Sequence, residues 1–375
     1  MKIGITCYPT YGGSGAVATE LGIALAARGH EVHFISYAHP FRLPSVSPRI
    51  YFHEVSIGQY PLFQYPPYDL ALAVRMHEVA TQQRLDLLHV HYAIPHATSA
   101  WLAKQMLRDT GVELPVVTTL HGTDITIVGQ DHSYHAITKF SIEKSDCVTA
   151  VSQYLKDETV RAFGCDNQRV EVIPNFVDPA VFSRAIGDPA LRQQLGDGRK
   201  VLMHISNMRP VKRVADVVQI FAAVRREIPS VLVMVGDGPE RSAAEEEARR
   251  LDIEKDVRFL GKIDAVAALL ACADLYLLTT DRESFGLSAL EAQACGVPVL
   301  GYHVGGLPEV VEPGVTGHLG EVGDIFGMAR GALDLLGNDT KWRAASDAAA
   351  QRAARLFATD RVLPMYEALY ADAVR

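Results

Sequence analysis

The sequence has no uninterrupted apolar run of the ~18 residues that a transmembrane helix needs. Its opening stretch, Met1–Pro9, is too short and too soon broken for a signal peptide and instead predicts a buried strand. We therefore expect a chain without a membrane span that works in the cytoplasm.

Cysteine is scarce, and its spacing excludes two common uses. The five cysteines are an odd number, lie far apart and form no C-x-x-C pair. This pattern argues against a disulfide framework and against a zinc ribbon, and it suits reduced thiols in the cytoplasm. We expect these side chains to be small core residues. They are Cys7, Cys147, Cys165, Cys272 and Cys295.

Positive charge is also in deficit, with 36 Lys and Arg against 44 Asp and Glu, which gives a net charge of −8. The acidic balance argues against a general nucleic-acid binder, because the phosphate backbone requires a basic footprint. The chain has neither internal repeats nor low-complexity tracts, and 48% of its residues are hydrophobic, as in ordinary globular proteins. Its 375 residues predict two domains, since domains usually hold about 100–200 residues.

Apolar strands alternate with amphipathic helices along both halves, which predicts an α/β chain with two doubly wound parallel sheets. The proline-bracketed segment Pro174–Pro179 reads as the hinge between them. Because ligands bind outside the carboxyl ends of such strands, we expect a deep cleft between the domains. Strands are predicted at 3–8, 31–36, 87–90, 116–120, 147–151, 170–173, 201–205, 231–235, 257–260, 275–279 and 298–301, and helices at 17–28, 70–83, 97–107, 137–145, 214–226, 240–251, 264–271, 286–294 and over most of 324–375.

The most specific motif is the segment Glu283–Glu291, which follows a predicted strand and opens a helix. A helix start offers free N–H groups and a partial positive charge, which suit a phosphate, and Gly286 lets an anion approach the backbone. Glu291 lies about one and a half turns into the helix, where its carboxylate can take two ribose hydroxyls. A solvated pair of surface acids is the alternative.

This segment resembles the E-x7-E signature of the retaining GT-B glycosyltransferases of family 4. The Gly296–Val299 strand, Gly305–Glu309, Val235–Glu240 and Met203–Lys212 also fit that family, so the resemblance spans the chain. It implies two Rossmann-like domains, an acceptor domain over 1–175 and a nucleotide-sugar domain over 176–357, with about 358–375 crossing back to the first. The residues that it places on the donor are Gly13, Gly15, Asn207, Arg209, Lys212, Glu283, Phe285, Gly286, Leu287 and Glu291.

Arg209 and Lys212 follow the first strand of the second half, and the resemblance puts them on the donor diphosphate. Fixed cations stabilise the charge that a leaving diphosphate gains, and losing one such group typically costs ~3 kcal/mol. With two cations and a helix dipole available, we expect no obligatory metal or other cofactor. A basic start to a solvated helix is the alternative. Arg213 stands where many relatives have glycine.

The first strand–helix turn, Gly12–Gly15, lacks the full G-x-G-x-x-G spacing, and no acid ends the strand Glu31–Ser36. Both absences disfavour a nicotinamide dehydrogenase. His121 follows the strand Val116–Leu120, and the resemblance places a histidine there near the transferred sugar. The catalytic candidates are therefore His121, Glu283, Arg209 and Lys212. His89 and His91 share a strand face, but no third ligand at suitable spacing supports a metal site.

The segments 40–44, 63–73, 89–97 and 118–126 closely resemble those of a subgroup of this family. That subgroup transfers N-acetylglucosamine from UDP-GlcNAc to the hydroxyl of L-malate, the first step of bacillithiol biosynthesis. Malate is a small dianion and needs a cationic, hydrogen-bonding pocket. The acceptor candidates are Ser14, Tyr92, Thr119 and Lys139. Relatives often carry arginine where Lys139 stands, and lysine lacks the bidentate fork. The resemblance implies attack from the face that the diphosphate leaves, and no carboxylate is clearly suited to a double displacement.

Three alternatives stay open. Another small anionic acceptor such as inositol phosphate would call for more cations on the first domain than the sequence identifies. A UDP-sugar epimerase would consume no acceptor, and a non-catalytic UDP-sugar sensor would bind without turnover. The sequence leaves a homo-oligomer open as well.

Overall fold

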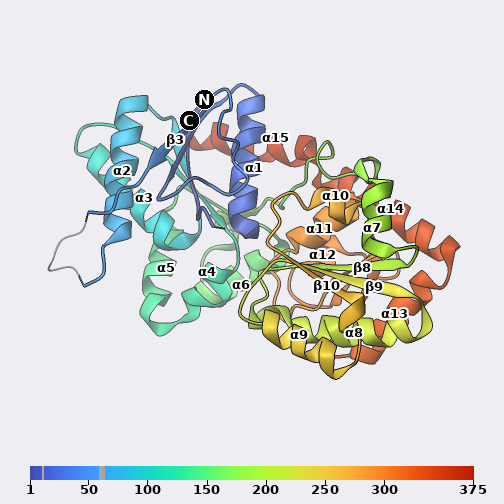
Figure 1. The fold of residues 1–375 in the computed structure, drawn as a ribbon. Helices are drawn as coiled ribbons and strands as arrows, with labels where there is room; N and C mark the ends of the chain where they lie inside the picture. Colours follow the sequence, from blue (N-terminus) through green and yellow to red (C-terminus); the bar gives the residue numbers. More distant parts are fainter. Residues whose placement is uncertain (11, 59–63) are drawn as a thin grey trace. The chain divides into compact units, whose positions relative to one another are not determined.

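The computed structural model describes residues 1–10, 12–58 and 64–375, and it divides into two compact units. The first unit holds Met1–Pro174 together with Val362–Arg375, and the second holds Asn175–Arg361. The division therefore falls inside the proline-bracketed segment at Pro174, and the end of the chain belongs with the first unit (Figure 1).

The first unit is built on a seven-stranded sheet in the order β3-β2-β1-β4-β5-β6-β7, with all neighbours parallel. Every residue of the central strands β4 and β5 is buried, as expected for a parallel sheet covered on both faces. The strands are β1 (Lys2–Thr6), β2 (Glu31–Ser36), β3 (Ile50–Glu54), β4 (Leu87–His91), β5 (Val116–Leu120), β6 (Cys147–Ala150) and β7 (Val170–Val172).

Helices connect these strands in the βαβ manner, and the last helix of the chain joins them. The helices are α1 (Gly13–Ala27), α2 (Tyr68–Gln83), α3 (Thr98–Arg108), α4 (Thr123–Thr126), α5 (His132–Lys144), α6 (Gln153–Phe163) and α15 (Thr359–Ala373). From Val362 onward α15 belongs to the first unit, where Tyr366 and Tyr370 are fully buried.

The second unit repeats the plan with a six-stranded parallel sheet in the order β10-β9-β8-β11-β12-β13. Its strands are β8 (Lys200–Ile205), β9 (Ser230–Val235), β10 (Val257–Gly261), β11 (Leu275–Leu278), β12 (Val299–Tyr302) and β13 (Gly317–Gly320). Its helices are α7 (Pro189–Gly196), α8 (Val214–Glu227), α9 (Arg241–Arg250), α10 (Ala267–Leu270), α11 (Leu287–Ala294), α12 (Leu307–Val310), α13 (Ile325–Leu336) and α14 (Asp339–Phe357).

The predicted fold class is confirmed: both units are Rossmann-like, and the last helix returns to the first unit. Both sheets reverse their strand order at one point, between β1 and β4 in the first and between β8 and β11 in the second. Such switch points leave room for ligands at the carboxyl ends of the strands. Ser14 and Tyr92 follow β1 and β4, and Lys212 and Glu283 follow β8 and β11, so these candidates lie at the two switch points.

The sequence analysis missed six helices and strands. It assigned no strand to β3 or β13 and no helix to α4, α6, α7 or α12, and it extended α10 to 264–271. The strand β3 lies at the sheet edge and is only partly buried, so it lacks an apolar run. The helices α6 and α7 are mostly polar, with Ser152 and Asp188 as the side chains that cap them.

Candidate functional site

In the first unit, the candidate residues Ser14 and Tyr92 meet where the sheet reverses. Ser14 lies in the first turn of α1, after β1, and Tyr92 follows β4 directly. The Tyr92 hydroxyl donates to Ser14 Oγ at 2.9 Å. Gly13 opens α1 and is exposed, whereas Gly15 is buried. A Cβ on Gly15 would lie 2.7 Å from the Tyr8 carbonyl oxygen, so only glycine lets the helix start this close to the strand.

His121 stands at the end of a stack of buried histidines. Its Nε2 lies 2.8 Å from His91 Nδ1, the rings of His91 and His121 stack at 5.0 Å, and those of His89 and His91 stack at 4.6 Å. Burial lowers the pKa of His121 to about 3, so its imidazole is neutral at physiological pH. The Tyr92 ring lies 5.3 Å from that of His121. The arrangement can offer hydrogen bonds to a sugar but no fixed positive charge.

Asp124 holds the loop that carries His121. Its Oδ1 accepts from the N–H groups of His121 and Gly122, at 3.3 and 3.0 Å, and its Oδ2 accepts from that of Ala93 at 2.9 Å. Burial raises the pKa of this carboxyl to about 6, against the lowering effect of those N–H groups. Because both oxygens are engaged with backbone, Asp124 orients the loop, and it is unsuited to act as a nucleophile.

The other two acceptor candidates are placed differently from Ser14 and Tyr92. Thr119 is fully buried, and its hydroxyl lies 2.7 Å from both His89 Nε2 and Thr149 Oγ1. The geometry argues against a direct acceptor contact through that hydroxyl, because the sheet residues already occupy it. Lys139 lies on α5 with 41% of its side chain exposed, and among the residues that the structure describes only Glu143 forms an ion pair with it, at 3.8 Å. Its ammonium group is therefore weakly held.

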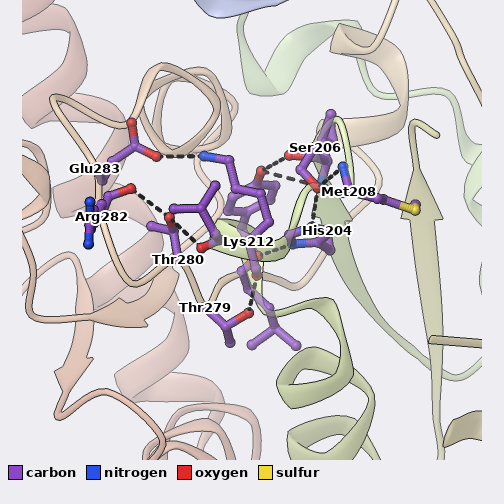
Figure 2. Close-up of polar contacts among 12 residues, drawn as sticks. His204, Ser206, Met208, Lys212, Thr279, Thr280, Arg282 and Glu283 are labelled. Atoms are coloured by element: carbon purple, nitrogen blue, oxygen red, sulfur yellow. Dashed lines mark hydrogen bonds and ion pairs between the residues drawn. The ribbon is translucent and has the colours of Figure 1, made fainter. Parts of the chain in front are cut away.

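In the second unit, the candidate cations follow β8 on a short turn, and Glu283 follows β11, the neighbouring strand. Lys212 Nζ donates to Glu283 Oε2 at 2.9 Å (Figure 2), and both side chains are mostly buried. Arg209 is exposed, and no described residue forms a hydrogen bond or ion pair with its side chain. This edge of the sheet thus combines a paired cation with an arginine whose donors face solvent.

The predicted phosphate helix is α11, which begins directly after Gly286. Gly286 has a φ of +99° and serves as the N-cap, a left-handed conformation that favours glycine. The Phe285 ring is buried against Phe357, with centroids 5.6 Å apart, so only its backbone can face a ligand. Leu287 is half-buried at the first helical position, and Glu291 is only 4% exposed inside the helix.

Two glycines bring a second loop close to the end of β8. A Cβ on Gly236 would lie 1.8 Å from the Ser206 carbonyl oxygen, and one on Gly238 would lie 1.9 Å from that of Asn207. These positions therefore require glycine, which explains the Val235–Glu240 motif in physical terms. The side-chain oxygen of Asn207 is buried and has no hydrogen-bond partner among the described residues.

The candidates thus form two groups, one on each unit. The first unit joins Ser14, Tyr92 and His121, while Lys139 lies apart on α5. The second gathers Lys212 and Glu283 beside the start of α11. The sequence analysis did not identify His91 or Asp124 as positioning groups, because their partners on other strands and loops gave no local signal.

Within residues 1–10, 12–58 and 64–375 no group of three His, Cys, Asp or Glu side chains is arranged to hold a metal ion. Both ring nitrogens of His89 lie 2.7 Å from hydroxyls, those of Tyr370 and Thr119. Among the same residues, no helix is long and apolar enough to cross a membrane.

Comparison with known proteins agrees with this architecture. Residues 11–181 match the family described as Glycosyltransferase Family 4, and residues 189–352 match Glycosyl transferases group 1. The structure of Anabaena HepE in complex with UDP and glucose superposes with a TM-score of 0.81 at 22% identity, covering 99% of both chains. That likeness shows the GT-B fold, and the two family models show that the chain is a glycosyltransferase.

Sequence relatives narrow the family. N-acetyl-alpha-D-glucosaminyl L-malate synthase of Bacillus anthracis is 51% identical over 100% of this chain and 98% of its own. A D-inositol 3-phosphate glycosyltransferase of Salinispora tropica is 31% identical, over 97% of this chain and 81% of its own. The chain belongs to glycosyltransferase family 4, as the E-x7-E motif predicted.

Proposed function

We propose that this enzyme transfers N-acetylglucosamine from UDP-GlcNAc to the hydroxyl of L-malate with retention, giving GlcNAc-malate and UDP. The observation that carries the proposal is the 51% identity, over the whole chain, to a protein named for that product. The reaction would be the first step of bacillithiol biosynthesis. The five cysteines, all unpaired, suit a reducing cytoplasm.

The donor half of the proposal rests on the second unit. The diphosphate would lie at the start of α11, where N–H groups, Arg209 and Lys212 supply positive charge. Glu291 would take the ribose hydroxyls and Glu283 the sugar. Since two cations and a helix start can balance the leaving diphosphate, we expect UDP release to survive chelation of divalent ions, and loss of activity in chelator would contradict that expectation.

The acceptor half rests on the first unit. Malate carries two carboxylates, and the Ser14 and Tyr92 hydroxyls with the Lys139 ammonium group offer donors of the required kind. The neutral His121 would hydrogen-bond the transferred sugar. In the proposed step the glycosidic C–O bond to the diphosphate breaks, and the malate oxygen bonds the same carbon from the same face. The malate hydroxyl proton passes to the departing diphosphate oxygen.

An inositol phosphate acceptor is the second candidate, favoured by the 31% identical relative named for that substrate. A phosphate monoester carries about two charges on one group and favours clustered arginines. Lys139 is the cation proposed for the acceptor, and it stands alone among the acceptor candidates. Malate is therefore the better match in charge.

The test is UDP release from UDP-GlcNAc with and without L-malate, followed by mass analysis of the product. Malate-dependent release of a malate-linked sugar supports the proposal. Release that ignores malate but responds to inositol phosphate would replace the acceptor and keep the donor. Conversion of UDP-GlcNAc without any acceptor would indicate an epimerase, and binding without turnover would indicate a sensor.

A further inference from the structure

The two candidate cations of the donor site lie on a segment with little support of its own. Arg209–Arg213 contains one short turn, Pro210–Lys212, and each of these side chains is half-buried or exposed. A turn this short has no apolar face to pack. Its position, and with it that of Lys212, must therefore be set by polar contacts to its backbone.

Thr279 and Thr280, directly after β11, supply those contacts (Figure 2). Thr279 Oγ1 donates to the carbonyl oxygens of Lys212 and Arg213, at 3.0 and 3.1 Å. Thr280 Oγ1 reaches the carbonyl oxygen of Val211 at 3.1 Å, and the Asp281 N–H donates to the same oxygen at 3.0 Å. Three consecutive residues after β11 thus bind three consecutive carbonyls of the cationic segment.

Thr280 also contacts the acidic side of the site. Its Oγ1 lies 2.7 Å from the carbonyl oxygen of Arg282, the residue before Glu283. One hydroxyl proton is therefore shared between the segment that carries Lys212 and the segment that carries Glu283. The ammonium and carboxylate groups of these two residues lie 2.9 Å apart, a separation that depends on both segments.

Both threonines are fully buried, and neither side chain is exposed to a ligand. Their hydroxyls donate to backbone oxygens of the segments that carry the site residues. Packing at a buried strand end would not need these hydroxyls, because valine has the same shape as threonine and would fill the same space. The hydroxyls are thus explained by the carbonyls that they bind.

We propose that Thr280, assisted by Thr279, is a positioning residue that holds Lys212 and Glu283 in register for the donor diphosphate. The inference rests on the donor half of the proposed function and is independent of the acceptor. Small displacements of such groups are costly, since an error of about 1 Å in a site can lower the rate about 100-fold.

The experiment compares Thr280→Val, which keeps the shape and removes the hydroxyl, with Thr280→Ser, which keeps the hydroxyl. We expect Thr280→Val to weaken UDP binding and to lower kcat/KM for UDP-GlcNAc by about tenfold or more, with KM for malate unchanged. Thr280→Ser should stay within about twofold of the natural protein. The proposal would be overturned if Thr280→Val had the same UDP affinity and kcat/KM as the natural protein. It would also be overturned if Thr280→Val and Thr280→Ser lost UDP affinity and kcat/KM equally.

A matched control separates positioning from stability. Thr159 on α6 is also fully buried and donates to a backbone carbonyl, that of Leu155 at 2.7 Å, in the other unit. Thr159→Val should lower Tm about as much as Thr280→Val without weakening UDP binding. If Thr280→Val fails to fold, Thr279→Val is judged by the same criteria, because its hydroxyl binds the Lys212 carbonyl directly.

A double-mutant cycle gives the sharpest test. If Thr280 acts through Lys212, Thr280→Val should change UDP affinity less than about twofold in a Lys212→Ala background. Additive losses would contradict the inference. If the natural protein binds UDP but its UDP release does not depend on malate, only the proposed acceptor is contradicted. If the natural protein does not bind UDP, the donor assignment and this inference are both contradicted.

Discussion

The Tyr370 hydroxyl lies 2.7 Å from His89 Nδ1, a contact between residues 281 positions apart that ties α15 to β4. The other ring nitrogen of His89 lies 2.7 Å from Thr119 Oγ1, which in turn lies 2.7 Å from Thr149 Oγ1. The end of the chain is thus bound into a polar network that runs across the centre of the first sheet. At the surface, Arg28 and Glu367 add an ion pair at 2.8 Å.

Replacing Tyr370 with phenylalanine should therefore destabilise the first unit. The change keeps the buried ring but leaves one nitrogen of His89 without its partner, which costs about 1–3 kcal/mol. Urea unfolding measures the loss, and Tyr134→Phe serves as the control because its side chain is half exposed on α5. Equal stability of the two variants would show that the Tyr370–His89 contact contributes nothing.

Buried neutral histidines predict a loss of stability in mild acid. Burial lowers the pKa of five fully buried imidazoles; the values are about 3 for His89 and His121, about 4 for His96 and His204, and well below the usual value for His91. Below about pH 6.5 these histidines become protonated in the unfolded chain, whereas in the folded protein they stay neutral. Stability therefore falls as pH falls, by about 1.4 kcal/mol per pH unit for each such group.

Asp124 opposes this trend. Burial raises its pKa to about 6, so between about pH 6 and 4 the folded state takes up a proton that the unfolded state binds only near pH 3.8. One carboxyl offsets one histidine, so the free energy of unfolding still decreases as the pH falls.

Urea unfolding between pH 7 and 5 measures how the free energy of unfolding changes with pH. His89→Gln should reduce that slope by about one proton. A flat profile would contradict the assignment of neutral imidazoles.

Lys212→Ala should abolish most turnover, because the ammonium group stabilises the charge of the leaving diphosphate. Loss of one preorganised cation costs about 3 kcal/mol, or about 100-fold in rate. Steady-state UDP release measures the effect, and Arg226→Ala removes an exposed cation at the end of α8 as a control for net charge. A folded Lys212→Ala enzyme with undiminished turnover would remove Lys212 from the reaction.

The sequence predicted the fold well where apolar periodicity determines it. The bounds of the central strands and of the helices that cover them were predicted to within a few residues, because burial of these elements requires a regular spacing of apolar residues. The edge strand β3 and the polar helices α6 and α7 gave no such pattern. In the site, the order of residues after each strand, together with the family resemblance, identified Ser14, Tyr92, Lys212 and Glu283 as candidates. It missed Thr279 and Thr280, because bonds to distant backbone carbonyls have no local signature.

Thr119 shows the limit of that reasoning in a single residue. Its place at the end of β5 made it an acceptor candidate, yet its hydroxyl joins His89 and Thr149 inside the network under α15. Alternate residues of a strand face opposite sides of the sheet, and the sequence does not say which side meets α15. The last helix, 240 positions away, decides this assignment.

Arg213 gives a prediction about backbone strain. It has a φ of +45°, which explains why glycine suits this position, and its Nε donates to Asp216 Oδ2 at 2.7 Å. Tyr302 donates to the same oxygen at 2.6 Å. Arg213→Gly and Arg213→Ala both lose the guanidinium group, but only glycine relieves the left-handed backbone. The free energy of unfolding of Arg213→Gly should therefore exceed that of Arg213→Ala by about 1 kcal/mol, as measured by urea unfolding. Equal free energies of unfolding for the two variants would show that the backbone at Arg213 is unstrained.

Lys139 gives the most direct test of the acceptor. Its ammonium group is held only weakly, by Glu143 at 3.8 Å, and so is available for a carboxylate. Lys139→Ala should raise KM for malate about tenfold or more and leave KM for UDP-GlcNAc unchanged, since hydrogen bonds to charged groups contribute about 1.5–3 kcal/mol. Lys139→Arg should lower KM for malate, because the guanidinium fork binds a carboxylate through two hydrogen bonds. Lys144→Ala, in the last turn of the same helix, is the control. If alanine at 139 changed both KM values equally, or neither, Lys139 would have no part in acceptor binding, and the cation that malate needs would have to come from another residue.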